Sequence, residues 1–529
     1  MRSLFVVFSV VVTLALLAGA FFWSPHVSWA FVLVGPVIAR GIADMVQTKQ
    51  AVRRNFPVIG NFRYLFEVIR PEINQYFVES NTDGVPFNRD TRSLVYQRAK
   101  LEPDTVPFGT RLDVNAIGYE WVNHSLAPVH VSPKSLRMTV GSSQCTQPYS
   151  ASIFNISAMS YGSLSKNAVL ALNGGAKLGE FAHDTGEGGL SPYHLEKGGD
   201  VIWQLGTGYF SARTLDGHFD AEKFKVNAQK PQVKMIEVKL SQGAKPGHGG
   251  ILPAAKVTKE ISEIRGVRMG EDVLSPPAHS AFSTPTQMME FIAKLRELSG
   301  GKPVGFKLCL GKRREFLAIC KAMKTTGVVP DFITVDGGEG GTGAAPLEFS
   351  NSVGSPLREA LIFVHNALTG FGVRKEIRVI ASGRVVTGFD VVTRLATGAD
   401  ACNSARAMMM ALGCIQALRC NTNECPTGVA TQRPELVKGL VVAHKEVRVA
   451  NYHRETMKTV AEMVGAMGLS SPTQLRPWHV MKRTGLAEIR HYGELLEFIP
   501  EGSLLSKDVP ESFARPMAAA RADTWASAA

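Results

Sequence analysis

Short apolar runs alternate with amphipathic stretches through the middle of the chain. From residue 152 onward, runs such as SIFNISAM, KMIEVKL and IRVIASG are each followed by a stretch with helical periodicity. Runs that are apolar at nearly every position predict strands buried on both faces, and such strands form parallel sheets when helices alternate with them. Six of these units are clear, and residues 181–210 supply two further strands. The pattern predicts an α/β protein built on an eight-stranded (β/α)8 TIM barrel of about 270 residues.

The pattern changes on both sides of the predicted barrel. Residues 46–149 are polar and mixed, and predict an irregular lead-in region. Residues 150–435 hold the barrel. Residues 436–529 begin with helical periodicity, which predicts helices packed outside the barrel, and end in a small-residue tail that we expect to be disordered.

The first 45 residues predict a membrane anchor. Residues 4–23 carry no charge, and a helix of about 20 such residues can cross a hydrocarbon layer of about 30 Å. A second apolar run, residues 29–39, either completes a helical hairpin or lies at the membrane interface. Four basic residues follow it: Arg40, Lys49, Arg53 and Arg54. By the positive-inside rule, we expect an anchor in the plasma membrane or a bacterial inner membrane, with the remaining chain in the cytoplasm. A cleaved signal peptide is the alternative, because residues 18–20 are small.

Charge and cysteine content narrow the classes of partner. The net charge is +12, but the basic residues are scattered and do not alternate with aromatic residues, so we expect no nucleic-acid partner. Seven cysteines are an odd number, and three of them lie within twelve residues, at Cys414, Cys420 and Cys425. This spacing is a poor plan for disulfides, and reduced thiols can bind metal instead. A structural zinc site would need a fourth ligand, for which His444 and His453 are the candidates.

Two loops predicted to follow the seventh and eighth strands suit an anion. In a (β/α)8 barrel, phosphate groups are usually bound there, at the carboxyl ends of the strands. Residues 382–388 and 403–407 combine glycine, serine and the basic side chains of Arg384 and Arg406, and each loop opens a predicted helix. Ordinary turns with solvent-facing arginines are the alternative interpretation.

Several other glycine-rich stretches contain polar side chains. They include Glu187, Lys239, Gln242, Lys245, His248 and Lys307. A lysine in the middle of a strand is costly to bury alone, so Lys239 and Lys307 should face an anion or the barrel mouth; salt bridges inside the barrel are the alternative. The G-x-G-x-x-G match at Gly338, Gly340 and Gly343 lies late in the barrel pattern and does not open a βαβ unit, so we do not interpret it as a dinucleotide site.

These motifs, taken in order, resemble a known family. SAMSYGSLS, TGEGG, QGAKPG, GGTGA and the C-x5-C-x4-C motif followed by PTGVATQ resemble the FMN-binding synthase domain of glutamate synthase over roughly residues 150–440. The whole chain is similar to short, membrane-anchored relatives described as FMN-binding glutamate synthase family proteins.

The resemblance implies two cofactors. Three cysteines, Cys414, Cys420 and Cys425, would ligate a 3Fe-4S cluster, which needs only three thiolates. FMN would lie at the carboxyl ends of the strands, with Ser160 beside its ring and Gln204 and Lys307 hydrogen-bonded to it. The phosphate would be held by one set of residues: Ser382, Gly383, Arg384, Ser404 and Ala405.

The resemblance also implies a reaction. Glu187, Lys239, Gln242 and Lys245 occupy the places where family members bind 2-oxoglutarate. The implied chemistry is addition of ammonia to the keto acid and hydride transfer from FMN to the resulting imine, which forms L-glutamate. A separate electron donor, a reductase or a ferredoxin, would supply electrons through the cluster.

The chain departs from the family pattern at four places, one of which is that the long form's C-terminal glycine-repeat helix is missing. The long form begins with a cysteine that hydrolyses glutamine, whereas this chain begins Met1-Arg2, so we expect no ammonia from that route. The family reads K-P-G-E-G-G-Q where this chain has His248 and Ile251, and Ile251 replaces a polar side chain expected to meet the keto acid. Gly338-Glu339 replaces a His-Asp pair. These departures concern the substrate, not the cofactors.

Overall fold

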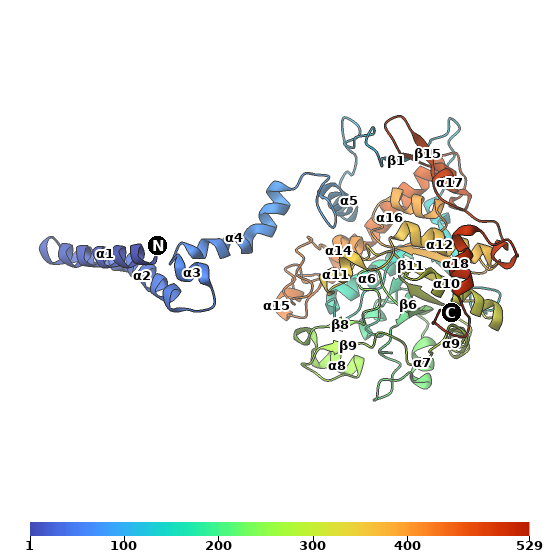
Figure 1. The fold of residues 1–529 in the computed structure, drawn as a ribbon, viewed down its shortest axis with the longest axis horizontal. Helices are drawn as coiled ribbons and strands as arrows, with labels where there is room; N and C mark the ends of the chain where they lie inside the picture. Colours follow the sequence, from blue (N-terminus) through green and yellow to red (C-terminus); the bar gives the residue numbers. More distant parts are fainter. Residues whose placement is uncertain (528–529) are drawn as a thin grey trace. The chain divides into compact units, whose positions relative to one another are not determined.

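Eight parallel strands close into a barrel in the second of two units, Met1–Asp90 and Thr91–Ala529, into which the chain divides. In this computed structural model, which describes residues 1–527, the strands follow one another around the barrel in chain order. They are β4 (Phe154–Ile156), β5 (His183–Asp184), β6 (Val201–Leu205), β7 (Val233–Lys239), β10 (Val304–Leu308), β11 (Phe332–Asp336), β12 (Arg378–Ser382) and β13 (Ala401–Ser404). The predicted (β/α)8 barrel is confirmed, and each strand lies in one of the eight stretches from which it was predicted (Figure 1).

The strand register brings polar residues to one level at the carboxyl ends. Gln204 pairs with Glu237 across β6 and β7, and Lys239 pairs with Lys307 across β7 and β10. Ser382 of β12 is flanked by Asp336 of β11. Most of the other strand residues are buried and apolar, so an apolar barrel interior lies beneath the polar residues of the mouth.

Helices cover the barrel and begin at ordinary caps. They are α6 (Lys166–Gly179), α7 (Ala221–Ala228), α9 (Pro285–Leu298), α10 (Arg313–Thr326), α12 (Leu357–Gly370), α13 (Gly388–Ala396) and α14 (Arg406–Leu412). The Ser165, Thr284 and Thr387 side chains accept backbone N–H groups at the starts of α6, α9 and α13. The segment between β7 and β9 instead forms a long excursion with β8 (Ile251–Leu252), η5 (Ala254–Lys256), α8 (Lys259–Arg265) and β9 (Val273–Leu274).

The C-terminal segment adds a long helix and a small sheet. Helix α16 (Val442–Ala466) packs on α6, where a side chain at Gly175 would come within 2.6 Å of Val449. Strands β14 (Val480–Arg483) and β15 (Ile489–His491) pair antiparallel, and β14 also pairs with β1 (Glu120–Val122). Helical periodicity predicted the helix but not this sheet.

The first unit is helical. Helix α1 (Arg2–Phe22) contacts α2 (Phe31–Val46) where the Phe5 ring covers Gly41, and Asp44 accepts a hydrogen bond from the Val58 N–H at 3.0 Å. Helices α3 (Ala51–Asn55) and α4 (Gly60–Ile73) follow. Two stretches, Arg2–Phe22 and Pro25–Val46, are long and apolar enough to cross a membrane, a property shared with signal sequences. The boundary between the units falls inside the predicted lead-in region 46–149, which therefore contributes to both.

Candidate active site

A polar layer crosses the barrel interior just below its mouth. Gln204 Nε2 donates to Glu237 Oε1 at 2.7 Å, and the Thr334 hydroxyl donates to the other oxygen of the same carboxylate. Lys307 Nζ lies 3.5 Å from Asp336 Oδ2. These residues come from four different strands and are all buried, so the layer is fixed by the barrel itself.

Two ionisable side chains in this layer, Lys307 and Asp184, have shifted pKa values. Burial opposes the ammonium of Lys307, but Asp336, Glu237 and Asp184 outweigh it and raise the pKa of Lys307 above its ordinary value. Burial and the nearby Glu237 raise the pKa of Asp184 well above its ordinary value. Lys307 is therefore a fixed cation, as expected for a residue facing an anionic partner, although the structure also gives it the intra-barrel ion pair that was the alternative.

A second group of charges lies at the mouth beside this layer. Lys239 Nζ contacts Glu187 Oε1 at 2.6 Å and donates to Gln242 Oε1 at 2.6 Å. Lys245 Nζ donates to the Ala344 carbonyl at 3.0 Å and lies within electrostatic range of Glu187. The structure thus brings together four residues predicted for substrate binding: Glu187, Lys239, Gln242 and Lys245.

Burial and neighbouring charge set the protonation of this group. Burial alone would raise the pKa of Glu187, but Lys239, and then Lys245 and Arg265, bring it below its ordinary value. Burial lowers the pKa of Lys245 to about 8, with Glu187 acting in the opposite direction. At neutral pH the group holds one carboxylate and at least two cations, which is an excess of positive charge suited to an acidic ligand.

Two residues that the sequence did not single out support this group. Arg265 is buried, donates from Nη2 to the Tyr161 carbonyl at 2.8 Å and lies within electrostatic range of Glu187. His279 contacts the Lys239 carbonyl through Nε2 at 2.8 Å, and burial lowers its pKa to about 4. Arg265 lies in α8 and His279 before α9, so no local motif connects either residue with the strand that carries Lys239.

Ser160 lies against the loop that carries Glu187. Its hydroxyl accepts the Gly188 N–H at 3.0 Å. Gly186 has φ +65°, and a side chain there would come within 2.7 Å of the Ser160 backbone nitrogen. The glycines of TGEGG therefore allow the loops after β4 and β5 to touch, which places Ser160 next to the charged group.

The two predicted phosphate loops are joined to each other. The Ser404 hydroxyl donates to the Val385 carbonyl at 2.6 Å, and Ser382 Oγ lies 3.3 Å from Ser157 Oγ. Gly383 has φ +137°, a conformation that favours glycine, and Arg384 is exposed. Ala405 directly precedes α14. These residues form a backbone-rich cradle between β12 and β13.

The loop that departs from the family pattern reaches the charged group through its backbone. A side chain at Gly250 would come within 2.8 Å of Glu187 Oε1. Ile251 begins β8, and the His248 ring lies 5.4 Å from the Phe349 ring. Both changed residues thus flank a glycine that touches Glu187.

The three clustered cysteines gather in the loop after α14. They are free thiols within electrostatic range of one another, and burial raises the pKa of Cys414 to about 12. Burial works against the Cys425 thiolate as well, yet the Thr427 hydroxyl and backbone N–H groups lower its pKa below the ordinary value. Within residues 1–527 no three His, Cys, Asp or Glu side chains are arranged to hold a metal ion.

The two histidines considered as a fourth zinc ligand do not join the cysteines. His453 Nε2 contacts the Phe154 carbonyl at 3.0 Å, and its ring stacks on Phe181 at 4.0 Å. His444 is exposed on α16. The donor set in this loop therefore consists of three thiols, a number that fits a 3Fe-4S cluster better than zinc.

The cysteine loop is tied to the loop that carries Ser160. Ser165 donates from its hydroxyl to the Gly428 carbonyl at 2.6 Å, and its N–H donates to the Val429 carbonyl at 2.9 Å. Gln432 Nε2 donates to the Gly162 and Leu164 carbonyls. A short, rigid connection thus links the cysteines with the barrel mouth.

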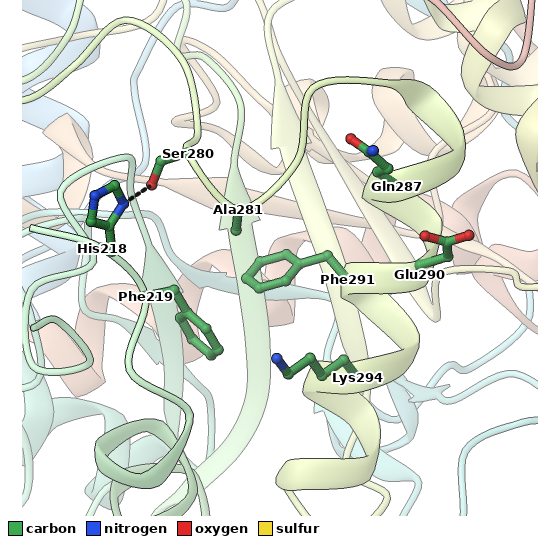
Figure 2. Close-up of a pocket in the computed structure, with 8 residues that line it drawn as sticks. All are labelled: His218, Phe219, Ser280, Ala281, Gln287, Glu290, Phe291 and Lys294. Carbon is green, nitrogen blue, oxygen red and sulfur yellow. Dashed lines mark hydrogen bonds between the residues drawn. The ribbon is translucent and has the colours of Figure 1, made fainter.

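A pocket of about 450 Å³ is lined by other residues (Figure 2). Its closest polar contact joins His218 Nδ1 and Ser280 Oγ at 3.3 Å. It is lined by His218, Phe219, Ser280, Ala281, Gln287, Glu290, Phe291 and Lys294, none of which was predicted as a site residue. The mouth, not this pocket, contains the predicted chemistry.

Comparisons with known proteins agree with the motifs. The family model described as a conserved region in glutamate synthase matches residues 128–470. The glutamate synthase large subunit-like protein YerD of Bacillus subtilis is 38% identical over 483 residues, which cover 84% of this chain and 91% of that protein. The archaeal glutamate synthase [NADPH] of Methanocaldococcus jannaschii is 37% identical, and the match covers 61% of this chain and 60% of that protein.

A solved structure of mandelate oxidase with (S)-2-phenylpropionate covers 78% of this chain and 96% of that chain, with 15% identity and a TM-score of 0.38. This likeness is too weak to carry any argument about function. The match to the family model and the identity to YerD settle the kinship: the chain belongs to the glutamate synthase family.

Proposed function

We propose that this protein is an FMN-dependent oxidoreductase that reduces the imine of 2-oxoglutarate and ammonia to L-glutamate. The observation that carries the proposal is the convergence of Glu187, Lys239, Gln242 and Lys245 at the barrel mouth. A relative that matches 61% of this chain is named archaeal glutamate synthase [NADPH], and the match spans 60% of its length.

The cradle between β12 and β13 fits the phosphate of FMN. Gly383 has φ +137° between Ser382 and the exposed Arg384, and the Ser404 hydroxyl, next to Ala405, donates to the Val385 carbonyl of the same loop. Gln204 and Lys307 would meet the flavin ring, because both reach the polar layer from the strands below the mouth. FMN, when bound, supplies the hydride that reduces the imine.

The residues of the mouth would bind and orient the acid. Lys239 and Lys245 provide cations for carboxylate oxygens, and Glu187 holds Lys239 in place through their 2.6 Å contact. Gln242, which receives a hydrogen bond from Lys239, has an amide N–H group left to donate to a ligand. Because Ile251 replaces a polar residue near this group, the alternative substrate is a different small 2-oxo acid.

We also propose that Cys414, Cys420 and Cys425 ligate a 3Fe-4S cluster. Their number, their common loop and the N–H groups around the Cys425 sulfur support it. A separate electron donor would reduce the protein, and two N-terminal helices would anchor it with the barrel in the cytoplasm. An electron-transfer subunit without a small substrate is the second candidate, favoured by the rigid link between the cysteine and mouth loops.

The two proposed cofactors are tested by measuring the FMN, iron and sulfide content of the purified protein. Protein purified without oxygen should contain FMN, about three iron atoms and about four sulfides per chain. Cys420→Ser should lose iron and keep FMN, because the phosphate cradle and the thiols belong to different loops. Flavin-free protein that carries zinc would overturn both cofactor assignments.

The acid site is tested by Lys245→Ala. Its loss should weaken 2-oxoglutarate binding about tenfold or more and leave the flavin spectrum unchanged, because one charge-assisted hydrogen bond is worth about 1.5–3 kcal/mol. Lys177→Ala, at an exposed position on α6, is the control. Unchanged affinity in Lys245→Ala would remove this residue from the site.

A further inference from the structure

Lys256 is a buried cation whose partners are neutral. It ends η5 and is 2% exposed. Its Nζ donates to the Ser163 carbonyl at 3.0 Å and to the Ala430 carbonyl at 2.8 Å. An ammonium removed from water needs an opposite charge to offset the cost of burial, and two carbonyl groups do not supply one.

The groups that can supply the opposite charge are the clustered thiols. Burial lowers the pKa of Lys256 to about 8, and Cys420 and Cys425 act in the opposite direction, because their thiolates lie within electrostatic range and stabilise the ammonium. Ala430, which accepts the shorter hydrogen bond, lies in the same loop as Cys425. Negative charge on this loop would therefore offset the cost of burying the Lys256 ammonium.

Lys256 also lies between two loops with different roles. Ser163 belongs to the loop after β4 that carries Ser160, whereas Ala430 belongs to the cysteine loop. A third bond, from Asn423 Nδ2 to the Ala255 carbonyl at 2.9 Å, fixes η5 to the cysteine loop. The ammonium is thus held at a defined place between the barrel mouth and the thiols.

We infer that Lys256 is a positioning residue that places a positive charge beside the iron–sulfur cluster proposed at Cys414, Cys420 and Cys425, and so raises its reduction potential. The inference rests on the proposed cluster. Reduction adds negative charge to the cluster, and a nearby buried cation stabilises the reduced state more than the oxidised state. Removal of the charge should make the cluster harder to reduce.

The test compares three variants of the full chain by an anaerobic redox titration followed by electron paramagnetic resonance. Lys256→Met keeps the length of the side chain and removes the charge, whereas Lys256→Arg keeps the charge. Lys259→Met removes an exposed lysine three residues away and is the control for net charge. Iron, sulfide and FMN per chain are measured for each protein, so that loss of the cluster is distinguished from misfolding.

Lys256→Met should shift the cluster equilibrium toward the oxidised state about tenfold, equivalent to 59 mV more negative for a one-electron couple. Lys256→Arg and Lys259→Met should stay close to wild type. Loss of iron from Lys256→Met alone, with FMN retained, would also overturn the inference, because the charge would then be needed to hold the cluster and not to set its potential. An unchanged potential in iron-replete Lys256→Met, or loss of iron from both Lys256 variants, would overturn the inference. Wild-type protein without iron would show instead that the proposed cluster is wrong.

Discussion

At the scale of single residues, Gly383 has a backbone conformation on which the proposed binding of FMN depends. Its φ of +137° is strained for any other residue, and it belongs to the loop proposed to hold the FMN phosphate. Gly383→Ala should cost about 1–3 kcal/mol of local strain and lower the FMN content of the purified protein. Gly311→Ala is the control, because nothing lies within 4 Å of a side chain there and its φ is ordinary. Full FMN occupancy in Gly383→Ala would argue against the cradle.

The lowered pKa of Glu187 makes the stability of the folded protein depend on pH. Its pKa is lowered in the folded state, mainly by Lys239 against the effect of burial. The ion pair therefore adds stability above about pH 4.3, the pKa of an unfolded glutamate, and this contribution is lost as the pH falls through the lower folded-state pKa. Glu187→Gln should lower the free energy of unfolding by ~2 kcal/mol at neutral pH, and the difference from wild type should shrink in acid.

Chemical denaturation across this pH range measures the effect. Glu348→Gln, on the exposed side of α11 (Leu347–Ser352), is the matched control. A difference between Glu187→Gln and wild type that stays constant down to low pH would contradict the assigned ion pair.

The sequence predicted some residues of the mouth and missed others for a physical reason. Lys239 and Lys307 stood out because a lysine inside an apolar strand is costly. Glu237 lies two residues before Lys239 in the same strand, but its partners Gln204 and Thr334 come from other strands and no local signal reveals them. Arg265 and Lys256 lie outside the strands altogether, and only the folded excursion between β7 and α9 brings them to the site.

At the scale of elements, the barrel was predictable because a strand that is buried on both faces is a short run of mostly apolar residues. The small sheet of β1, β14 and β15 was not, because its strands are short and half exposed. The pair between Trp121 and Met481 also joins positions very far apart in the chain. Such pairing is decided by tertiary packing and not by local pattern.

The close packing of α6 on α16 can be tested by a substitution at their contact. A methyl group at Gly175 would come within 2.6 Å of Val449 and 2.9 Å of the Glu446 carbonyl oxygen. Gly175→Ala should destabilise the protein by about 1–3 kcal/mol through overpacking, as measured by thermal or chemical unfolding. Gly439→Ala, at an exposed site, should change little. Equal stability of the two variants would contradict the close packing of α6 on α16.

At the scale of the whole molecule, the N-terminal unit carries the proposal of a membrane anchor. Helix α1 and the second apolar stretch, Pro25–Val46, have the length and hydropathy of membrane spans. The full chain should stay in the membrane fraction after washing with high salt and with alkaline carbonate, and a variant without residues 2–46 should be released. A mature protein that begins after residue 20 and appears in the soluble fraction would identify a cleaved signal peptide instead.

The match to YerD covers 84% of this chain and 91% of that protein, so the kinship extends over most of both chains. The mouth, the phosphate cradle and the cysteine loop all lie within the second unit, Thr91–Ala529. All residues proposed for the chemistry therefore belong to this unit, and the proposed anchor belongs to the first.

The most direct test of the proposed reaction is a single-turnover experiment. The protein is reduced without oxygen, then mixed with 2-oxoglutarate and ammonia while the flavin absorbance is followed and glutamate is measured. We predict that the oxidised flavin spectrum returns and that about one glutamate forms per flavin, only when both substrates are present. A flavin that stays reduced with both substrates, or that reoxidises without forming glutamate, would contradict the proposed function.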